Sequence, residues 1–354
     1  MRRSCLHMLL GLASLPGASA CAEGELPLRA LAEKRGLLIG AAVSEQSIRT
    51  DDAYCALLAR EYNILTSENR MKFGPIQPVR GQFDWSNADT LVEFCERHGM
   101  VVHGHTLLWH GQRPDWLGDD AFFSREEMTE IITTYVNTYV GRYKGRIAIW
   151  DVVNEAFVPP SERPDGWRRE LPWYRSLGKD YFEMAFRLAH EADPEALLVY
   201  NDYGIEVENP KSDVTHRILG EMLKQGVPIH GVGFQFHHRT EELLKPEVIA
   251  SVERNLQRFA DLGLKLYITE LDLPILGEKT PEAYQRQAEA YGNIMAAALR
   301  QPACKGFQVW GVSDRNSWLD HVMEPKGTSK APLLFDRDLE PKPAYRALQE
   351  ALTR

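Results

Sequence analysis

The chain has 354 residues, of which 44% are hydrophobic and 26% are charged, and its formal net charge at pH 7 is −9. This balance is typical of a globular protein with a large core, and it excludes disordered, collagen-like and polytopic membrane chains. The acidic balance also argues against a nucleic-acid partner, because an acidic surface repels phosphate backbones.

The N-terminal segment 1–20 has the three parts of a secretory signal. Two arginines precede an apolar stretch at 6–15, and small residues follow up to Ala20. The apolar stretch is too short to cross a bilayer, so no transmembrane segment is predicted. Cys21 follows directly and is an alternative lipid-attachment site, although Ala18 stands where lipid-attachment boxes have Leu. The pattern predicts export, to the periplasm or the medium after simple cleavage, or to the outer membrane as a lipoprotein anchored at Cys21.

Three further cysteines, Cys55, Cys95 and Cys304, are scattered along the chain in apolar contexts. No two of them have the spacing of a metal site, and three cysteines make no disulfide framework. We predict buried free thiols, with one oxidised pair as the alternative in an oxidising compartment.

From residue 37 onward, short apolar runs alternate with amphipathic helical stretches. Continuous apolar runs without alternation favour parallel strands that are covered on both faces. Eight such units predict right-handed crossovers and closure into a single (β/α)8 TIM barrel over residues 25–354. The predicted strands are Leu37–Val43, Ile64–Asn69, Val101–Trp109, Ala148–Glu155, Leu197–Tyr203, Gly231–His237, Lys265–Asp272 and Gly306–Asp314.

Helix starts support this organisation. Ser124 with Glu127 predicts a capping box, and Asn209 and Thr280 each precede a proline at a first helical position. An open doubly wound sheet is the structural alternative. The segment 38–42 lacks the glycine fingerprint of such folds, so no nucleotide cofactor is predicted.

Polar and aromatic residues crowd the carboxyl ends of the predicted strands, where TIM barrels carry their catalytic groups. Glu155 closes the fourth strand and Glu270 closes the seventh, and burial of either carboxylate is costly without a purpose. Since these strands lie across the barrel mouth, the two side chains can face each other over a ligand. Such a pair suits cleavage of a glycosidic bond, in which one carboxyl protonates the departing oxygen and the other attacks or stabilises the anomeric carbon. A buried ion pair with Arg or Lys is the alternative for either residue alone.

Seven segments, in chain order, resemble the motifs of family 10 glycoside hydrolases, which are mostly endo-1,4-β-xylanases. They are SENRMK (67–72), GHTLLWH (104–110), WDVVNEA (150–156), NDY (201–203), GVGFQFHH (231–238), ITELD (268–272) and VWGVSDRNSW (309–318). The resemblance runs from about residue 28 to the C-terminus. It implies endo-hydrolysis of 1,4-β-D-xylosidic linkages in xylan or xylo-oligosaccharides, with retention of configuration and with neither a cofactor nor a metal.

The resemblance also implies roles for individual residues. Glu155 is expected to be the general acid/base and Glu270 the nucleophile, with their carboxyl groups about 5–5.5 Å apart. His237 is expected to orient Glu270, and Asn154 to hold the sugar 2-hydroxyl. The remaining positions match substrate-binding residues of the family, the first six on the non-reducing side of the cleaved bond: Glu68, Asn69, Lys72, His105, Trp109, Gln112, Gln235, Trp310 and Trp318.

The chain departs from the family pattern at two places. Gly204 follows the NDY motif where Asn is common, and Val309 precedes Trp310 where an aromatic residue is frequent. Neither change touches the two carboxylates, and both are expected to alter subsite affinity. Tyr203 is expected to support the cleft wall, with an ordinary core position as the alternative.

Two other functions compete with this interpretation. A metal-dependent hydrolase would use His103 and His105, whose alternation places both on one face of a strand, with His237 and Asp314 as further ligands. This hypothesis leaves the two glutamates without a role. A sugar-binding protein that has lost catalysis is the other alternative, and it conflicts with the presence of both carboxylates.

Overall fold

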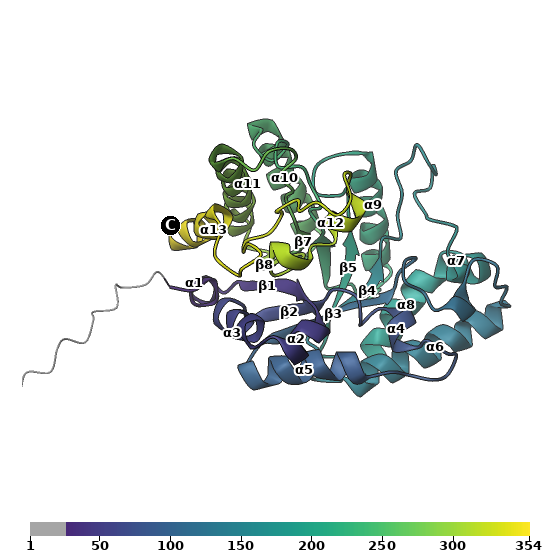
Figure 1. Cartoon of the computed structure of the whole chain (residues 1–354). Coiled ribbons are helices and arrows are strands. Elements are labelled where there is room, and N and C mark those ends of the chain that lie inside the picture. The colour runs from purple at the N-terminus through teal and green to yellow at the C-terminus, as the bar shows by residue number, and fades with distance from the viewer. Residues whose placement is uncertain (1–25) are drawn as a thin grey trace, which may run out of the picture.

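The computed structural model describes residues 26–354, and its centre is a closed barrel of eight parallel strands (Figure 1). Each strand pairs with the next one along the chain, and β8 closes the ring by pairing with β1. The predicted TIM barrel is therefore confirmed. The strands are β1 (Leu38–Val43), β2 (Ile64–Ser67), β3 (Val101–Leu108), β4 (Ile149–Asn154), β5 (Leu197–Asp202), β6 (Gly231–Phe234), β7 (Lys265–Leu271) and β8 (Cys304–Val309).

The predicted strands begin within two residues of the observed ones, but most of them end too late. The largest error is β8, which was expected at 306–314 and ends at Val309. The Trp310 N–H still donates to the Leu271 carbonyl of β7 at 3.1 Å, but Gly311 then turns the chain with φ +134°, and the Asp314 N–H donates to the Phe335 carbonyl at 2.9 Å. The apolar residues that follow therefore belong to a loop over the barrel mouth. Glu155, His237 and Glu68 likewise lie just beyond their strands rather than in them.

Helices surround the barrel, and the three predicted helix starts are confirmed. Ser124 and Glu127 form a capping box. The side chains of Asn209 and Thr280 accept hydrogen bonds from backbone N–H groups of the helices that they cap. The helices are α1 (Leu28–Lys34), α2 (Glu45–Thr50), α3 (Asp52–Glu61), α4 (Phe73–Ile76), α5 (Ser86–His98), α6 (Arg125–Arg142), α7 (Pro172–Leu177), α8 (Asp180–Ala192), α9 (Pro210–Lys224), α10 (Pro246–Ala260), α11 (Pro281–Arg300), α12 (Leu319–Val322) and α13 (Pro343–Thr353), with single 3-10 turns at Asp115–Leu117 and Asp314–Asn316.

The inside of the barrel is layered. Ile64, Ile149, Val199 and Tyr267 form a small apolar cluster within the ring. A polar layer lies further along the strands, where Thr66 donates to Gln308 at 2.8 Å, Gln308 donates to His103 at 2.9 Å, and His103 bonds Asp151 at 2.9 Å. This hydrogen-bonded layer forms a rigid floor below the carboxyl ends of the strands.

The first and last helices are fastened to each other. Glu61, which is only 2% exposed, accepts hydrogen bonds from the Leu28 N–H at 3.0 Å and from the Tyr345 hydroxyl at 2.9 Å. Gln349 of α13 donates to the Leu26 carbonyl at 3.0 Å. One buried carboxylate on α3 thus joins α1 to α13.

The predicted signal segment and Cys21 lie outside the described residues. Within residues 26–354, no helix combines the length and apolarity needed to cross a bilayer. Cys55, Cys95 and Cys304 are free thiols, as predicted, although Cys55 is only partly buried.

Candidate active site

A cavity of about 450 Å³ opens at the carboxyl ends of the strands. All thirteen site residues expected from the sequence line it, together with Tyr203. The lining residues are Glu68, Asn69, Lys72, His105, Trp109, Gln112, Asn154, Glu155, Tyr203, Gln235, His237, Glu270, Trp310 and Trp318.

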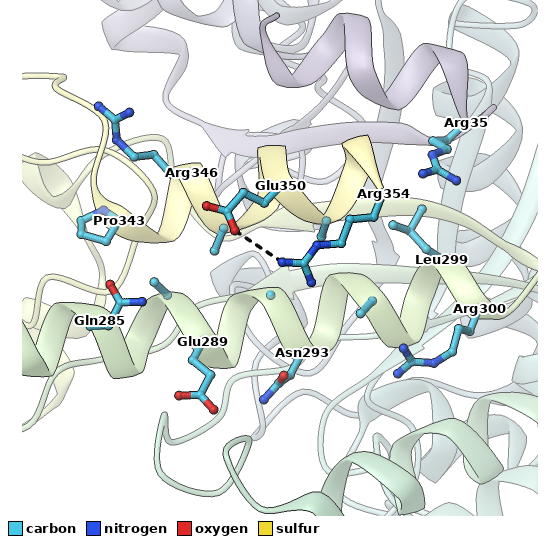
Figure 2. A pocket seen from close by; sticks show the side chains of 15 residues that line it. Arg35, Gln285, Glu289, Asn293, Leu299, Arg300, Pro343, Arg346, Glu350 and Arg354 are labelled. Atoms are coloured by element: carbon cyan, nitrogen blue, oxygen red, sulfur yellow. Dashed lines mark ion pairs between the residues drawn. The ribbon is translucent and has the colours of Figure 1, made fainter. Parts of the chain in front are cut away.

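A larger hollow of about 730 Å³ lies on the outside of the barrel, between α11 and α13 (Figure 2). Its walls are small residues such as Ala288 and Gly292, with charged side chains at the rim, where Arg354 pairs with Glu350 at 3.6 Å. The described residues that line it include no aromatic side chain. The smaller cavity is therefore the better candidate, because it alone joins aromatic walls to converging polar groups.

Glu270 follows the apolar part of β7 and is 4% exposed. Asn201 donates to its Oε1 at 2.7 Å, and His237 donates to its Oε2 at 3.1 Å. Burial raises the pKa of this carboxyl, but the hydrogen bond and charge of His237, the charge of His105 and the Asn201 hydrogen bond outweigh burial. The pKa of Glu270 is therefore lowered below its ordinary value, and the side chain is ionised and oriented before any ligand arrives.

His237 lies between two carboxylates. Its Nε2 faces Glu270, and its Nδ1 faces Asp272 at 2.9 Å. Since both partners are acceptors, both ring nitrogens carry protons. Burial lowers the pKa of His237, but the two carboxylates raise it well above its ordinary value. Trp318 donates from Nε1 to the second oxygen of Asp272 at 2.7 Å, so a tryptophan of the cavity wall is tied to the histidine that orients Glu270.

Glu155, 8% exposed, occupies the turn directly after β4. Gln235 donates to its Oε1 at 3.0 Å, and the Nε2 of His110 lies 3.6 Å from its Oε2. Burial lowers the pKa of His110 and so favours the neutral ring, although the charge of Glu155 acts in the opposite direction. Asn154 also donates to Oε1 at 3.4 Å, so the donors to Glu155 are neutral amides, whereas Glu270 also accepts from the charged ring of His237. The two carboxyl groups therefore have clearly different surroundings.

Three side-chain amides connect the two carboxylates. Asn201, which donates to Glu270, also donates to Asn154 Oδ1 at 3.0 Å, and Gln235, which donates to Glu155, approaches the same oxygen at 3.2 Å. Thr269 fixes the orientation of Asn201 by donating to its Oδ1 at 2.7 Å. Asn201 fits here only because residue 233 is glycine, since a Cβ at that position would lie 2.2 Å from Asn201 Oδ1.

Another part of the cavity wall carries a buried cation. Lys72 lies 4.5 Å from the centroid of the Trp109 ring and 3.4 Å from Asn69 Oδ1. Burial lowers the pKa of Lys72, opposed by Glu270, Glu68 and Glu155. Burial also raises the pKa of Glu68 to about 7, so this carboxyl can donate as well as accept a hydrogen bond near neutral pH. Gln112 donates to the same Asn69 oxygen at 2.8 Å and completes a group suited to sugar hydroxyls.

Backbone conformation aims several of these groups. Gln112, Glu155 and Phe236 are non-glycine residues with left-handed backbone angles, φ +47°, +56° and +59°. Such residues cost about 1–2 kcal/mol each, and they persist where neighbouring groups fix them. The Phe236 N–H, for example, donates to Glu206 at 3.0 Å. These turns direct Glu155, and the residues on either side of Phe236, into the cavity.

The histidine pair proposed above as metal ligands is used differently. His103 Nε2 and His105 Nδ1 bond the two oxygens of Asp151 at 2.9 and 2.8 Å. Burial raises the pKa of Asp151, but the two histidines outweigh it and lower the pKa to about 2. Across residues 26–354, no group of three or more His, Cys, Asp or Glu side chains has the geometry of a metal site.

Sequence reasoning missed four residues that hold the candidate catalytic groups: His110, Asn201, Asp151 and Asp272. All four lie inside or beside the quoted motifs. His110, Asn201 and Asp272 lie at or just beyond strand ends, which was the available signal, whereas Asp151 lies inside β4. The partners of these residues could not be predicted from the sequence, because each contact joins residues that belong to different strands.

Comparison with known proteins gives the same family throughout. The family model for glycosyl hydrolase family 10 matches residues 27–351. The chain is 41% identical to endo-1,4-beta-xylanase B of Thermotoga neapolitana, over 98% of this chain and 96% of that protein, and 37% identical to an endo-1,4-beta-xylanase of Geobacillus stearothermophilus, over 87% and 93%. Xylanase 10B of Thermotoga petrophila RKU-1, crystallised with xylobiose, superposes with a TM-score of 0.86 at 40% identity, covering 94% of this chain and 98% of that one. The chain belongs to glycosyl hydrolase family 10.

Proposed function

We propose that the protein is a retaining endo-1,4-β-xylanase, in which Glu270 is the nucleophile and Glu155 the general acid/base. The observation that carries this proposal is the pair of glutamates in one aromatic-walled cavity, one of them ionised beside the charged His237 and the other held by neutral amide donors. The names of the related xylanases, and the xylobiose in one of their crystals, support xylan or xylo-oligosaccharides as the substrate.

In the first step, a Glu270 oxygen forms a bond to the anomeric carbon of the xylose on the non-reducing side of the scissile linkage. The bond from that carbon to the departing oxygen breaks, and Glu155 gives its proton to that oxygen. The Asn201 and His237 hydrogen bonds keep Glu270 in place for the attack. Asn154 is positioned by its neighbours to meet the sugar 2-hydroxyl.

In the second step, water attacks the same carbon and the ester bond to Glu270 breaks. Glu155, now without its proton, takes one from the water. Two inversions give net retention of configuration. No step needs a metal or an organic cofactor, since the carboxylates supply both the nucleophile and the proton.

The test of this proposal is hydrolysis of xylan by residues 22–354. We expect release of reducing ends, a mixture of short xylo-oligosaccharides early in the reaction, and the β-anomer as the first product by proton NMR. Formation of the α-anomer would contradict the retaining mechanism. Release of xylose alone from the earliest time points would contradict endo cleavage.

We expect substitution of His237 by Asn to move the acidic limb of the pH profile of kcat/KM upward by roughly one unit or more. Glu270 must be ionised to attack, and loss of His237 removes a hydrogen bond and a charge that now outweigh the effect of burial. The pKa of Glu270 then rises, so activity is lost at a higher pH than in the wild type. His216→Asn, on the outer helix α9, is the matched control, and an unmoved acidic limb in H237N would contradict this role.

Export and the fate of Cys21 are part of the same proposal. The signal pattern at 1–20 supports a protein that meets polymeric substrate outside the cytoplasm. The mass of the mature protein from a Gram-negative host distinguishes simple cleavage after Ala20 from a lipid on Cys21. A lipidated form partitions into detergent, and Cys21→Ser abolishes that partitioning.

A further inference from the structure

The backbone at Glu155 has a conformation that glutamate does not favour. Its φ of +56° is left-handed, a region that side chains other than Gly, Asn and Asp rarely adopt. The Glu155 N–H donates to the Asn201 carbonyl at 2.9 Å, which continues the pairing of β4 with β5 by one residue. The chain then leaves the sheet at Ala156. Groups beyond the strand must therefore fix the turn.

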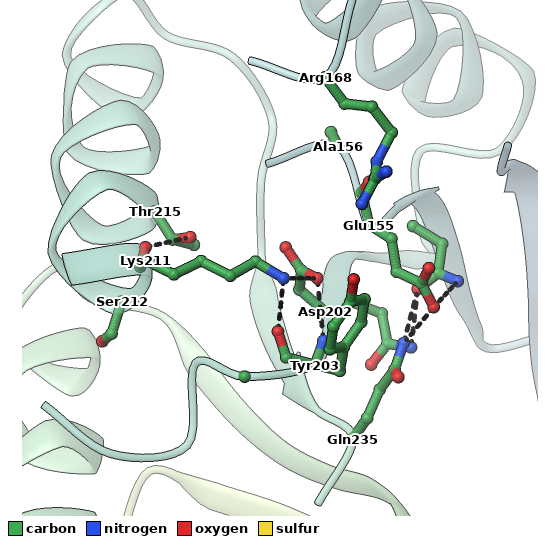
Figure 3. A network of polar contacts seen from close by, with 12 residues as sticks. Glu155, Ala156, Arg168, Asp202, Tyr203, Lys211, Ser212, Thr215 and Gln235 are labelled. Atoms are coloured by element: carbon green, nitrogen blue, oxygen red, sulfur yellow. Dashed lines mark hydrogen bonds and ion pairs between the residues drawn. The ribbon is translucent and has the colours of Figure 1, made fainter. Parts of the chain in front are cut away.

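Arg168 holds one side of this turn. Its Nε donates to the Glu155 carbonyl at 3.1 Å, and its backbone N–H donates to the Ala156 carbonyl at 2.9 Å. A short antiparallel bridge between Phe157 and Trp167 ties the two segments together. This side of the turn is held mainly by backbone contacts, and Figure 3 shows Arg168 reaching toward Glu155.

The other side is held by a side chain. The Ala156 N–H donates to the hydroxyl of Tyr200 at 3.1 Å, and Tyr200 is fully buried in β5. The hydroxyl in turn donates its single proton to Asp202. That donation leaves an oxygen lone pair for Ala156, so the order of donors is fixed by Asp202.

Asp202 is itself held by an ion pair. Lys211 Nζ, on the first turn of α9, donates to Asp202 Oδ1 at 2.7 Å, and the two residues are 7% and 0% exposed (Figure 3). Asn209 caps that helix end, and this fixes the base of the lysine. Burial raises the pKa of Asp202 to about 6, even though Lys211 and Tyr200 lower it. Such a pair is costly to bury without further contacts.

Lys211 has further contacts, and they reach the cavity wall. Its Nζ donates to the Tyr203 carbonyl at 2.6 Å and lies 3.8 Å from the centre of the Tyr203 ring. Tyr203 lines the cavity and is 43% exposed. One lysine therefore fixes both the wall residue Tyr203 and, through Asp202 and Tyr200, the turn that carries Glu155.

We propose that Tyr200, Asp202 and Lys211 are positioning residues for the general acid/base: they hold the Glu155 turn so that its carboxyl is directed at the departing oxygen, without touching the substrate themselves. The proposal rests on the role of Glu155 given above. It gives the buried ion pair between Lys211 and Asp202 a role in catalysis in addition to any role in folding.

The experiment compares two leaving groups in a Tyr200→Phe variant, which keeps the ring and removes only the hydroxyl. Cleavage of xylohexaose needs a proton on the departing oxygen, whereas 2,4-dinitrophenyl β-xylobioside has a leaving group that departs without one. We expect kcat/KM for xylohexaose to fall about 30-fold or more, because small misplacements of a catalytic group are costly. For the dinitrophenyl substrate we expect a fall of less than about threefold, since no proton transfer is needed.

A second measurement addresses the base step. Azide attacks a glycosyl-enzyme without help from a base, so azide should raise kcat of Tyr200→Phe on the dinitrophenyl substrate and leave that of the wild type unchanged. Asp202→Asn, which keeps the shape and removes the ion pair, should give the same selective pattern. Tyr62→Phe is the matched control. Tyr62 follows α3 directly, its buried hydroxyl has no hydrogen-bond partner, and it lies outside the cavity lining.

Equal losses on both substrates would overturn the proposal, because they would show a general disturbance of the barrel rather than a misplaced acid. Unchanged kinetics in both variants would overturn it as well. The proposed function is judged separately from the wild type and Tyr62→Phe. If these fail to cleave xylohexaose but cleave the dinitrophenyl substrate, the substrate assignment is wrong, and the azide response still decides whether Tyr200 positions Glu155.

Discussion

Replacement of Glu270 by Gln is expected to lower kcat on xylan by roughly 10⁵-fold, which corresponds to about 7 kcal/mol of transition-state stabilisation. The amide cannot form a stable ester with the anomeric carbon, so the first step has no nucleophile. Its size is conserved, and Asn201 and His237 still meet a side chain of the same shape. The measurement is reducing-end release from xylan together with mass spectrometry of protein trapped with a 2-fluoro-xylobioside, which labels the wild type at Glu270 and leaves the variant unlabelled.

Glu61→Gln is the matched control for Glu270. Glu61 is also a buried carboxylate, but it lies on α3 and binds Leu28 and Tyr345. We expect this variant to lose stability and keep its activity per folded molecule. If Glu270→Gln retained more than a few per cent of wild-type activity while folded, the assigned nucleophile would be wrong.

The second large effect is expected for Glu155→Ala, with a loss of roughly 10³–10⁴-fold in kcat/KM on xylan. The loss should nearly vanish in kcat/KM for 2,4-dinitrophenyl β-xylobioside, whose leaving group needs no proton. In that case the glycosyl-enzyme accumulates, because no base activates water. Azide should then restore turnover and give the β-xylobiosyl azide, which NMR identifies.

An inert azide, or a product with inverted configuration, would contradict the acid/base role of Glu155. Glu206→Gln serves a different purpose here. Glu206 is buried and holds the Phe236 turn and the Gly204 N–H, but it does not line the cavity. A loss in this variant that is similar on both substrates would show the effect of disturbing the cavity wall without removing the acid/base. The pattern for Glu155→Ala must differ from it.

The barrel could be predicted from the sequence because its strands are buried on both faces. Runs such as Ile149–Asn154 are mostly apolar and are buried at every position, and each is followed by a segment of helical periodicity. Caps such as Ser124 with Glu127 involve neighbouring residues, so they are visible in the sequence. The end of β8 was misplaced because Trp310 and Val312 are also apolar, although Gly311 between them turns the chain out of the ladder.

The site was predictable to the extent that strand ends converge in a barrel. Glu155 and Glu270 were found because each follows an apolar strand, and the family motifs supplied the others. The positioning groups were not predictable, because the contact that joins them to the site, from the Ala156 N–H to the Tyr200 hydroxyl, spans 44 residues of sequence. Tyr200 and Lys211 lie close to Asp202 in sequence, but only the fold shows that both side chains bond to it. The left-handed turn at Glu155 has no local sequence signal either, since Glu does not favour it.

The closure of β1 against β8 also sets the order in which this protein can fold. Leu38–Val43 finds its last partner only in Cys304–Val309, and α1 completes its contact with α13 through Glu61 later still. Contacts between such distant segments are slow to form, and every shorter nascent chain presents two open sheet edges. The barrel therefore stays open until Cys304–Val309 has been made. The helix α13 is therefore among the last elements to pack against the barrel.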